Sequence, residues 1–156
     1  MKVLFMCTAN SCRSILSEAM FNHLAPPGFE AVSSGSFPKG RVLPRSLSTL
    51  QDAGIATAGL YSKGNEAFEG APPDIVITVC DKAAGEACPV YFGPAVKAHW
   101  GLADPSEVVA DEAATDQAFR ATLAQIERRC RAFFELPFES LSVPGLRLEL
   151  ERISTL

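Results

Sequence analysis

The sequence predicts an α/β domain, a three-layer sandwich in which helices flank a central parallel sheet of about four strands. Short apolar segments, typical of strands buried on both faces, alternate with longer segments of helical periodicity. Successive strands are separated by roughly 20–40 residues, as in right-handed helical crossovers. A chain of 156 residues fits one domain. We therefore expect residues 1–156 to form a single domain, with residues 137–156 as a C-terminal helical extension of unknown role.

The first part of the chain predicts two strands and two helices. Residues 3–6 form a short apolar run, typical of a buried strand, and a helix is expected over 14–24 because its apolar residues recur at helical spacing. Residues 30–34 predict a second strand. Pro44 opens a helix through residue 53, which Gly54 ends.

The middle of the chain predicts two further strands. Residues 57–73 are rich in Gly, Ala and polar groups and indicate a loop, with a short helix near residues 66–68. The β-branched run over residues 74–79 is the most convincing strand in the chain. Residues 95–100 give a weaker strand signal.

The last third is predicted to be helical. Residues 104–116 carry five acids and no Lys or Arg, and they lead into a long amphipathic helix whose apolar residues, from Phe119 to Phe133, step by four and three. Cys130 falls on that apolar stripe and is expected in the core, whereas Arg128, Arg129 and Arg131 are expected on a solvated face. Pro137 interrupts the helix, and residues 144–153 predict a short last one.

Three reactive side chains follow strand ends. Cys7 comes just after the first strand, Cys80 just after the third, and Asp104 a few residues after the fourth. Ligands of parallel sheets bind outside the carboxyl ends of the strands. These three side chains are therefore expected to converge on one edge.

Composition narrows the function. A net charge of -4 argues against a general binder of nucleic acid or of anionic membranes, and no apolar run approaches the roughly 18–20 residues of a membrane span. We expect a cytoplasmic protein. Five cysteines in a reducing compartment favour catalytic, metal-bound or buried thiols over a disulfide framework. The pairs Cys7/Cys12 and Cys80/Cys88 both lack the short spacing of structural zinc sites. We therefore expect no metal, and we expect no cofactor.

The loop after the first strand has the features of an oxyanion site. Between a strand and a helix, its backbone N–H groups can form a nest, the helix start adds positive potential, and Arg13 can clamp two oxygens. The same donors are expected to lower the pKa of Cys7 and make it a nucleophile. The candidate oxyanion-binding residues are Thr8, Ala9, Asn10, Ser11, Cys12, Arg13 and Ser14.

This loop resembles the signature loop of low-molecular-weight tyrosine phosphatases and of the arsenate reductases that share their fold. The resemblance covers most of residues 1–135. It extends through Ser33-Ser34-Gly35, Val79-Cys80, Cys88-Pro89 and His99-Trp100-Gly101 to Asp104-Pro105. The additional cysteines and the His-Trp-Gly segment are similar to the arsenate reductase branch.

The resemblance to the reductases implies a thiol relay that converts arsenate to arsenite. Cys7 attacks arsenate, Asp104 assists loss of water, Cys80 attacks Cys7, and Cys88 then attacks Cys80. Thioredoxin, or glutaredoxin with glutathione, would reduce the final disulfide, and phosphate or sulfate would bind as analogues. One alternative is a phosphatase using Cys7, Arg13 and Asp104. A non-enzymatic oxyanion or thiol sensor is a third.

The sequence departs from the family at two positions, and the proposed relay sets one geometric requirement. The family's phosphatases usually carry a tyrosine after Asp-Pro, where this chain has Ser106. Some of its reductases bind potassium through an acid that corresponds to Lys63, so we hypothesise that Lys63 replaces the ion, pairs with Glu18 and makes activity independent of potassium. One continuous helix would place the Cα atoms of residues 80 and 88 about 12 Å apart, too far for a disulfide. The segment between them must therefore be looped or must rearrange.

Overall fold

The structure, a computed structural model, describes residues 1–80 and 94–156. Cys88, and the expected looping of the segment that carries it, therefore lie outside the described residues. The strands are β1 (Lys2–Cys7), β2 (Glu30–Gly35), β3 (Ile75–Thr78) and β4 (Val96–His99). The α-helices are α1 (Arg13–Leu24), α2 (Pro44–Asp52), α4 (Glu112–Phe134) and α5 (Val143–Ile153), with 3₁₀ turns η1 (Asn65–Phe68), η3 (Pro105–Glu107) and η4 (Phe138–Ser140).

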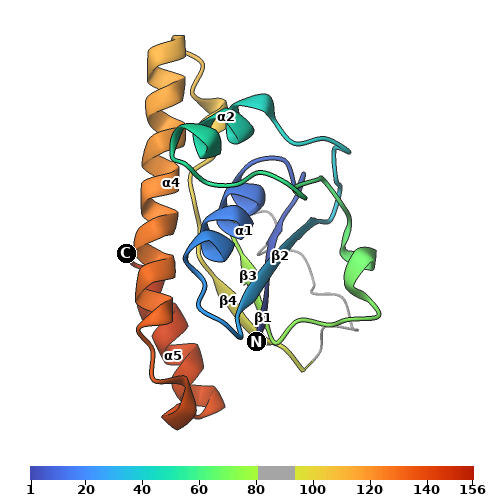
Figure 1. Cartoon of the computed structure of the whole chain (residues 1–156), viewed down its shortest axis with the longest axis vertical. Coiled ribbons are helices and arrows are strands. Elements are labelled where there is room, and N and C mark those ends of the chain that lie inside the picture. The colour runs from blue at the N-terminus through green and yellow to red at the C-terminus, as the bar shows by residue number, and fades with distance from the viewer. Residues whose placement is uncertain (81–93) are drawn as a thin grey trace.

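The four strands of the described part form one parallel sheet in the order β2-β1-β3-β4. The predicted α/β class and the parallel sheet are confirmed. Strand β1 lies inside the sheet, with Cys7 opposite Gly35 of β2. Because all strands run the same way, the segments that follow β1, β3 and β4 leave from one edge (Figure 1).

The main core lies between the sheet and a layer formed by α1, α4 and α5 (Figure 1). Phe5 of β1 contacts Phe21 of α1 with ring centroids 5.8 Å apart, and Phe21 contacts Phe133 of α4 at 5.3 Å. Cys130 is fully buried in this core, as predicted. A smaller cluster on the opposite face includes Leu4 of β1, with Phe68 of η1 packed against it.

The helix starts follow local capping chemistry. Helix α4 begins at Glu112, inside the acidic segment and earlier than the apolar spacing indicated, because the Asp111 side chain accepts a 2.7 Å hydrogen bond from the Ala114 N–H. Ser142 caps α5 in the same way through Gly145 at 3.1 Å. No helix of the described ranges is long and apolar enough to cross a bilayer.

Candidate active site

The loop between β1 and α1 is held from outside by its carbonyl groups. The carbonyls of residues 7, 8, 9 and 11 accept backbone N–H bonds from Ser36, Phe37, Lys39 and Leu43, at 2.9–3.3 Å. In a trans peptide the C=O and the following N–H point in opposite directions, and the described residues contain no cis peptide. Outward carbonyls therefore turn the N–H groups of the loop inward, as an oxyanion cradle requires.

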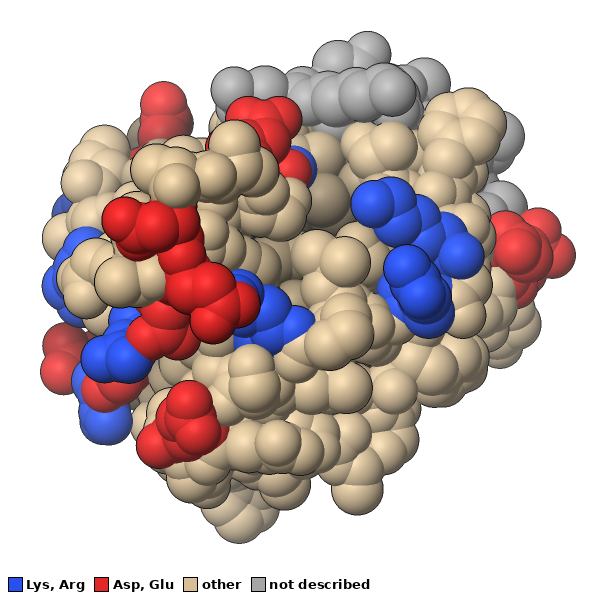
Figure 2. Space-filling model, turned by 90° about the horizontal axis from the view of Figure 1, so that it is seen from above, with Lys and Arg blue, Asp and Glu red and all other residues tan. Residues whose placement is uncertain are grey.

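The cradle opens into a cavity of about 670 Å³, lined by Cys7, Arg13, Cys80 and Asp104 together with most of the loop. The convergence predicted for Cys7, Cys80 and Asp104 is thus confirmed. Figure 2 looks down on this edge, where most of the acidic side chains in view lie to the left of a hollow with some Lys and Arg among them, and a separate group of Lys and Arg side chains lies to its right. Lys39 and Glu107 are among the charged residues that line the cavity.

Asn10 fixes the shape of the loop from within. Its backbone has φ +47°, in the left-handed region, and its side chain is fully buried. The amide nitrogen donates to Ser14 Oγ at 2.9 Å and to Ser33 Oγ at 3.0 Å, and the amide oxygen accepts the Lys63 N–H at 2.9 Å. The hydroxyl of Ser14 is therefore part of the support of the loop.

Arg13 and Asp104 meet at the mouth of the cavity. Arg13 Nη1 donates to the Leu102 carbonyl at 3.0 Å, and its Nη2 lies 3.5 Å from Asp104 Oδ2. The other carboxylate oxygen of Asp104 accepts from the backbone N–H and the hydroxyl of Ser106, at 3.0 and 2.6 Å. Asp104 is thus both the cap of η3 and a cavity residue. The sequence reasoning did not identify Ser106 as its partner, although an Asx-turn at Asp-Pro-Ser would have indicated it.

Cys7 and Cys80 lie together in the cavity, and Thr8 Oγ1 lies 3.6 Å from Cys80 Sγ. The hydrogen bond with Cys80, together with burial, raises the pKa of Cys7 above its ordinary value, while Arg13 and the Thr8 N–H lower it by less. The expectation of a lowered Cys7 pKa is therefore wrong for this arrangement. The loop donors are present, but a second thiol competes with them.

Two further cysteines stay protonated near neutral pH. Burial raises the pKa of Cys12, which lines the cavity beside Cys7, to about 11, and it raises that of Cys130 to about 12. Among the thiols of the described residues, Cys80 is the one placed against Cys7.

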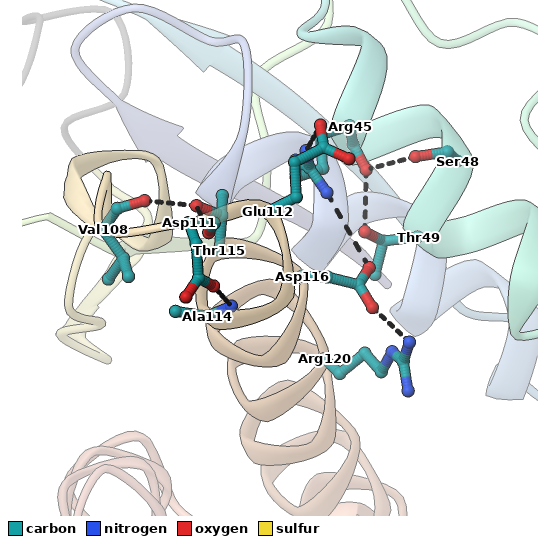
Figure 3. A network of polar contacts seen from close by, with 10 residues as sticks. All are labelled: Arg45, Ser48, Thr49, Val108, Asp111, Glu112, Ala114, Thr115, Asp116 and Arg120. Atoms are coloured by element: carbon teal, nitrogen blue, oxygen red, sulfur yellow. Dashed lines mark hydrogen bonds and ion pairs between the residues drawn. The ribbon is translucent and has the colours of Figure 1, made fainter.

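A network of polar contacts at the surface links α2, α4 and the residue that follows η3 (Figure 3). Arg45 of α2 lies 3.0 Å from Glu112 and 3.9 Å from Asp116, both on α4. Thr115, one turn into α4, donates to the carbonyl of Val108, just after η3, at 2.5 Å. Ser46 of α2 also donates a hydrogen bond to the Ser11 carbonyl in the β1–α1 loop. The network therefore connects the loop that follows Cys7 to the segment that carries Asp104. Each exposed ion pair contributes at most about 1 kcal/mol to stability, so the connection depends on all of these contacts together.

The model of the low molecular weight phosphotyrosine protein phosphatases matches residues 2–142. The chain belongs to this family. The match covers every residue placed in the cavity and ends at the residue before α5 begins.

Within the family, the chain is similar to proteins named as arsenate reductases. It is 27% identical over 133 residues to one from Halalkalibacterium halodurans, covering 85% of this chain and 94% of that protein. It is 29% identical over 128 residues to the glutaredoxin arsenate reductase of Synechocystis, covering 82% and 92%. The solved structure of an arsenate reductase in the phosphate binding state superposes with a TM-score of 0.70 at 27% identity, covering 85% and 95%.

A buried ion pair supports the family's loop from behind. Lys63 Nζ lies 3.6 Å from Glu18 Oε1, and the side chains are 8% and 11% exposed. Lys63 also donates to the Tyr61 carbonyl at 2.9 Å, while Glu18 accepts from Ser33 at 2.7 Å. The expected pairing of Lys63 with Glu18 is confirmed. The ammonium already supplies positive charge beside the carboxylate, and independence of potassium stays a prediction.

Replacing Lys63 with methionine is expected to destabilise the fold in a pH-dependent way. Removing one partner of a buried pair costs about 3 kcal/mol. Burial raises the pKa of Glu18 and Lys63 opposes that shift, so the variant's Glu18 has a still higher folded-state pKa. A folded-state pKa above the unfolded one makes stability fall as pH rises through the folded value. Urea unfolding should therefore show a larger deficit at pH 8 than at pH 5.

The double variant Glu18→Gln/Lys63→Met serves as the control for this pH effect. It lacks the carboxylate, so its deficit relative to the wild type should not grow between pH 5 and pH 8. An equal deficit at pH 5 and pH 8 in Lys63→Met itself would contradict the role given to the pair.

Proposed function

We propose that this chain is an arsenate reductase in which Cys7 attacks arsenate and Cys80 completes the two-electron reduction. The observation that carries the proposal is the contact between two thiols inside a cavity that also holds Arg13 and Asp104. Hydrolysis of a phosphate ester needs one nucleophile, an anion cradle and an acid. Reduction needs a second thiol next to the first.

The first half of the reaction builds an adduct. The Cys7 thiolate attacks arsenic while the inward N–H groups and Arg13 hold the remaining oxygens, and one oxygen leaves as water after taking a proton from Asp104. Cys80 then attacks Cys7 Sγ. The S–As bond breaks with its electron pair left on arsenic, so As(V) becomes As(III), arsenite departs, and the two thiols are oxidised to a disulfide.

The second half restores the nucleophile. By the resemblance of the sequence to the reductases, Cys88 attacks Cys80, which frees Cys7 and leaves a Cys80–Cys88 disulfide. An external dithiol, thioredoxin or glutaredoxin with glutathione, then reduces that disulfide. The glutaredoxin type has support from the name of the Synechocystis relative, and supplying each reductant separately in a turnover assay decides between them.

Disulfide mapping after one equivalent of arsenate tests the proposal. The reduced chain should yield a Cys80–Cys88 disulfide and one equivalent of arsenite, whereas Cys88→Ser should stop at Cys7–Cys80. The control Cys130→Ala, which changes a core thiol far from the relay, should give the pattern of the unchanged chain. Phosphate should produce no disulfide. Absence of any arsenate-dependent disulfide would overturn the reductase assignment.

Phosphatase activity is the second candidate, because the chain belongs to a phosphatase family and has the Arg13–Asp104 pair at its cavity. Cys7, Arg13 and Asp104 suffice for ester hydrolysis through a phosphoenzyme. Ser106 stands where the family's phosphatases usually have a tyrosine, so we propose slow hydrolysis of simple aryl phosphates as a side activity. This activity, unlike reduction, should not need Cys80.

A further inference from the structure

A buried guanidinium joins the C-terminal helix to the catalytic edge. Arg129 of α4 is 4% exposed, so the prediction that it lies on a solvated face is wrong. Its Nη1 donates to the Gly101 carbonyl at 3.1 Å and its Nη2 to the Ser154 carbonyl at 2.9 Å. Its buried Nε has no partner among the described residues. Burying such a group costs free energy, which its two hydrogen bonds partly offset.

The residue before Gly101 makes a second connection to α5. The indole of Trp100 is buried, and its Nε1 donates to the Leu150 carbonyl at 3.0 Å. Ser154 is the C-cap of α5 and Leu150 lies one turn earlier. The end of α5 is therefore tied to two consecutive residues that follow β4, directly to Trp100 and through the Arg129 guanidinium to Gly101.

Leu102, which follows Gly101, contacts Arg13. Leu102 is fixed to the sheet by its N–H, which donates to Val79 at 3.0 Å, and its carbonyl accepts from Arg13 Nη1. The carbonyls of Gly101 and Leu102 thus each accept from a guanidinium, one from Arg129 and the other from Arg13. Asp104 follows two residues later. A shift of this segment would turn the Arg13 fork away from the cradle.

We propose that Arg129 is a positioning residue, through which α5 fixes residues 100–104 and thereby aims Arg13 at the bound oxyanion. Helix α5 lies beyond the family match, which ends at residue 142, so this device belongs to the added C-terminal segment. The inference rests on the role proposed for Arg13 in oxyanion binding. It requires only that a tetrahedral oxyanion binds, whatever reaction follows.

Substitutions at two neighbouring arginines test the inference. In Arg129→Met we expect the Kd for inorganic phosphate and the KM for arsenate to rise about tenfold, the scale on which small misplacements of binding groups act. Arg129→Lys, which can still reach one carbonyl, should recover part of the loss. Arg128→Met is the matched control because Arg128 is adjacent and exposed, and it should stay within about twofold. Phosphate binding is measured by isothermal titration calorimetry, and thermal unfolding is measured in parallel.

Several outcomes would overturn the inference. One is an Arg129→Met protein with a lower unfolding midpoint but unchanged Kd and KM when fully folded, since the role would then be structural only. Another is an equal effect in Arg128→Met. If Arg129→Met does not fold, unchanged affinities in Arg129→Lys are decisive against it. If the wild type binds phosphate but does not reduce arsenate, only the proposed function fails. The ratio of the phosphate Kd of Arg129→Met to that of the wild type then still tests the role of Arg129. A wild type that binds no oxyanion overturns both.

Discussion

Replacing Cys80 with serine is expected to reduce multiple-turnover arsenate reduction at least about 1,000-fold, because the second nucleophile of the relay is lost. Cys80 lies against Cys7 in the cavity, and a hydroxyl cannot form the disulfide that carries off two electrons. Hydrolysis of an aryl phosphate, which uses only Cys7, Arg13 and Asp104, should stay within a few-fold of the wild-type rate. Measuring both activities on one preparation separates the two chemistries. Equal loss of both would show that Cys80 supports the site in general.

Replacing Cys80 with alanine should also change the reactivity of Cys7. The hydrogen bond of the protonated Cys7 thiol to Cys80 is the largest cause of the raised Cys7 pKa, whereas Arg13 and the Thr8 N–H act in the opposite direction. Removing Cys80 should therefore lower the Cys7 pKa and increase its thiolate fraction at neutral pH. The pH dependence of Cys7 alkylation, followed residue by residue, should move to lower pH. A profile that moves to higher pH would contradict this reading of the pair.

Gly35→Ala is expected to damage the oxyanion cradle directly. A Cβ at residue 35 would lie 2.4 Å from the Thr8 carbonyl oxygen and 2.9 Å from the Asn10 nitrogen, both backbone atoms of the loop. Since neither can rotate away, the loop must shift, at a cost of about 1–3 kcal/mol in stability. A displacement of about 1 Å in a positioned site costs about 100-fold in rate. We therefore expect a similar loss in kcat/KM for arsenate, with weaker phosphate binding.

Gly70→Ala is the matched control for this prediction. Nothing lies within 4 Å of a Cβ built at residue 70, so the substitution adds the same methyl group without a collision. Its kcat/KM and phosphate affinity should equal those of the wild type. Wild-type activity in Gly35→Ala would show that the loop tolerates displacement and would remove the basis for a preorganised cradle.

Much of the site could be predicted because a parallel sheet brings distant residues to one edge. Cys7, Cys80 and Asp104 are separated by long stretches of sequence, yet each follows a strand. Strand signals are local, since buried strands are short apolar runs, so the edge could be inferred without knowing the strand order. The pairing of Lys63 with Glu18 came from the family resemblance.

The remaining features depend on packing that a linear pattern does not contain. The raised pKa of Cys7 arises because a thiol from another strand end touches it, and the spacing of the two residues does not reveal that contact. Arg129 was expected on the solvated side together with Arg128 and Arg131, because helical periodicity separates faces but does not show that α5 covers one of them. The early start of α4 depends on the cap formed by Asp111.

The outward carbonyls of the β1–α1 loop also have a consequence for product release. Because the four outward carbonyls, on residues 7, 8, 9 and 11, accept backbone N–H bonds, the interior of the loop presents hydrogen-bond donors and not acceptors. Such a lining binds an anion more tightly than a neutral molecule. Arsenous acid is uncharged at neutral pH, so in the proposed reaction the substrate enters as an anion and its reduced product is a neutral molecule that the loop binds weakly. Reduction of the arsenic would thereby weaken the binding of its own product to the loop.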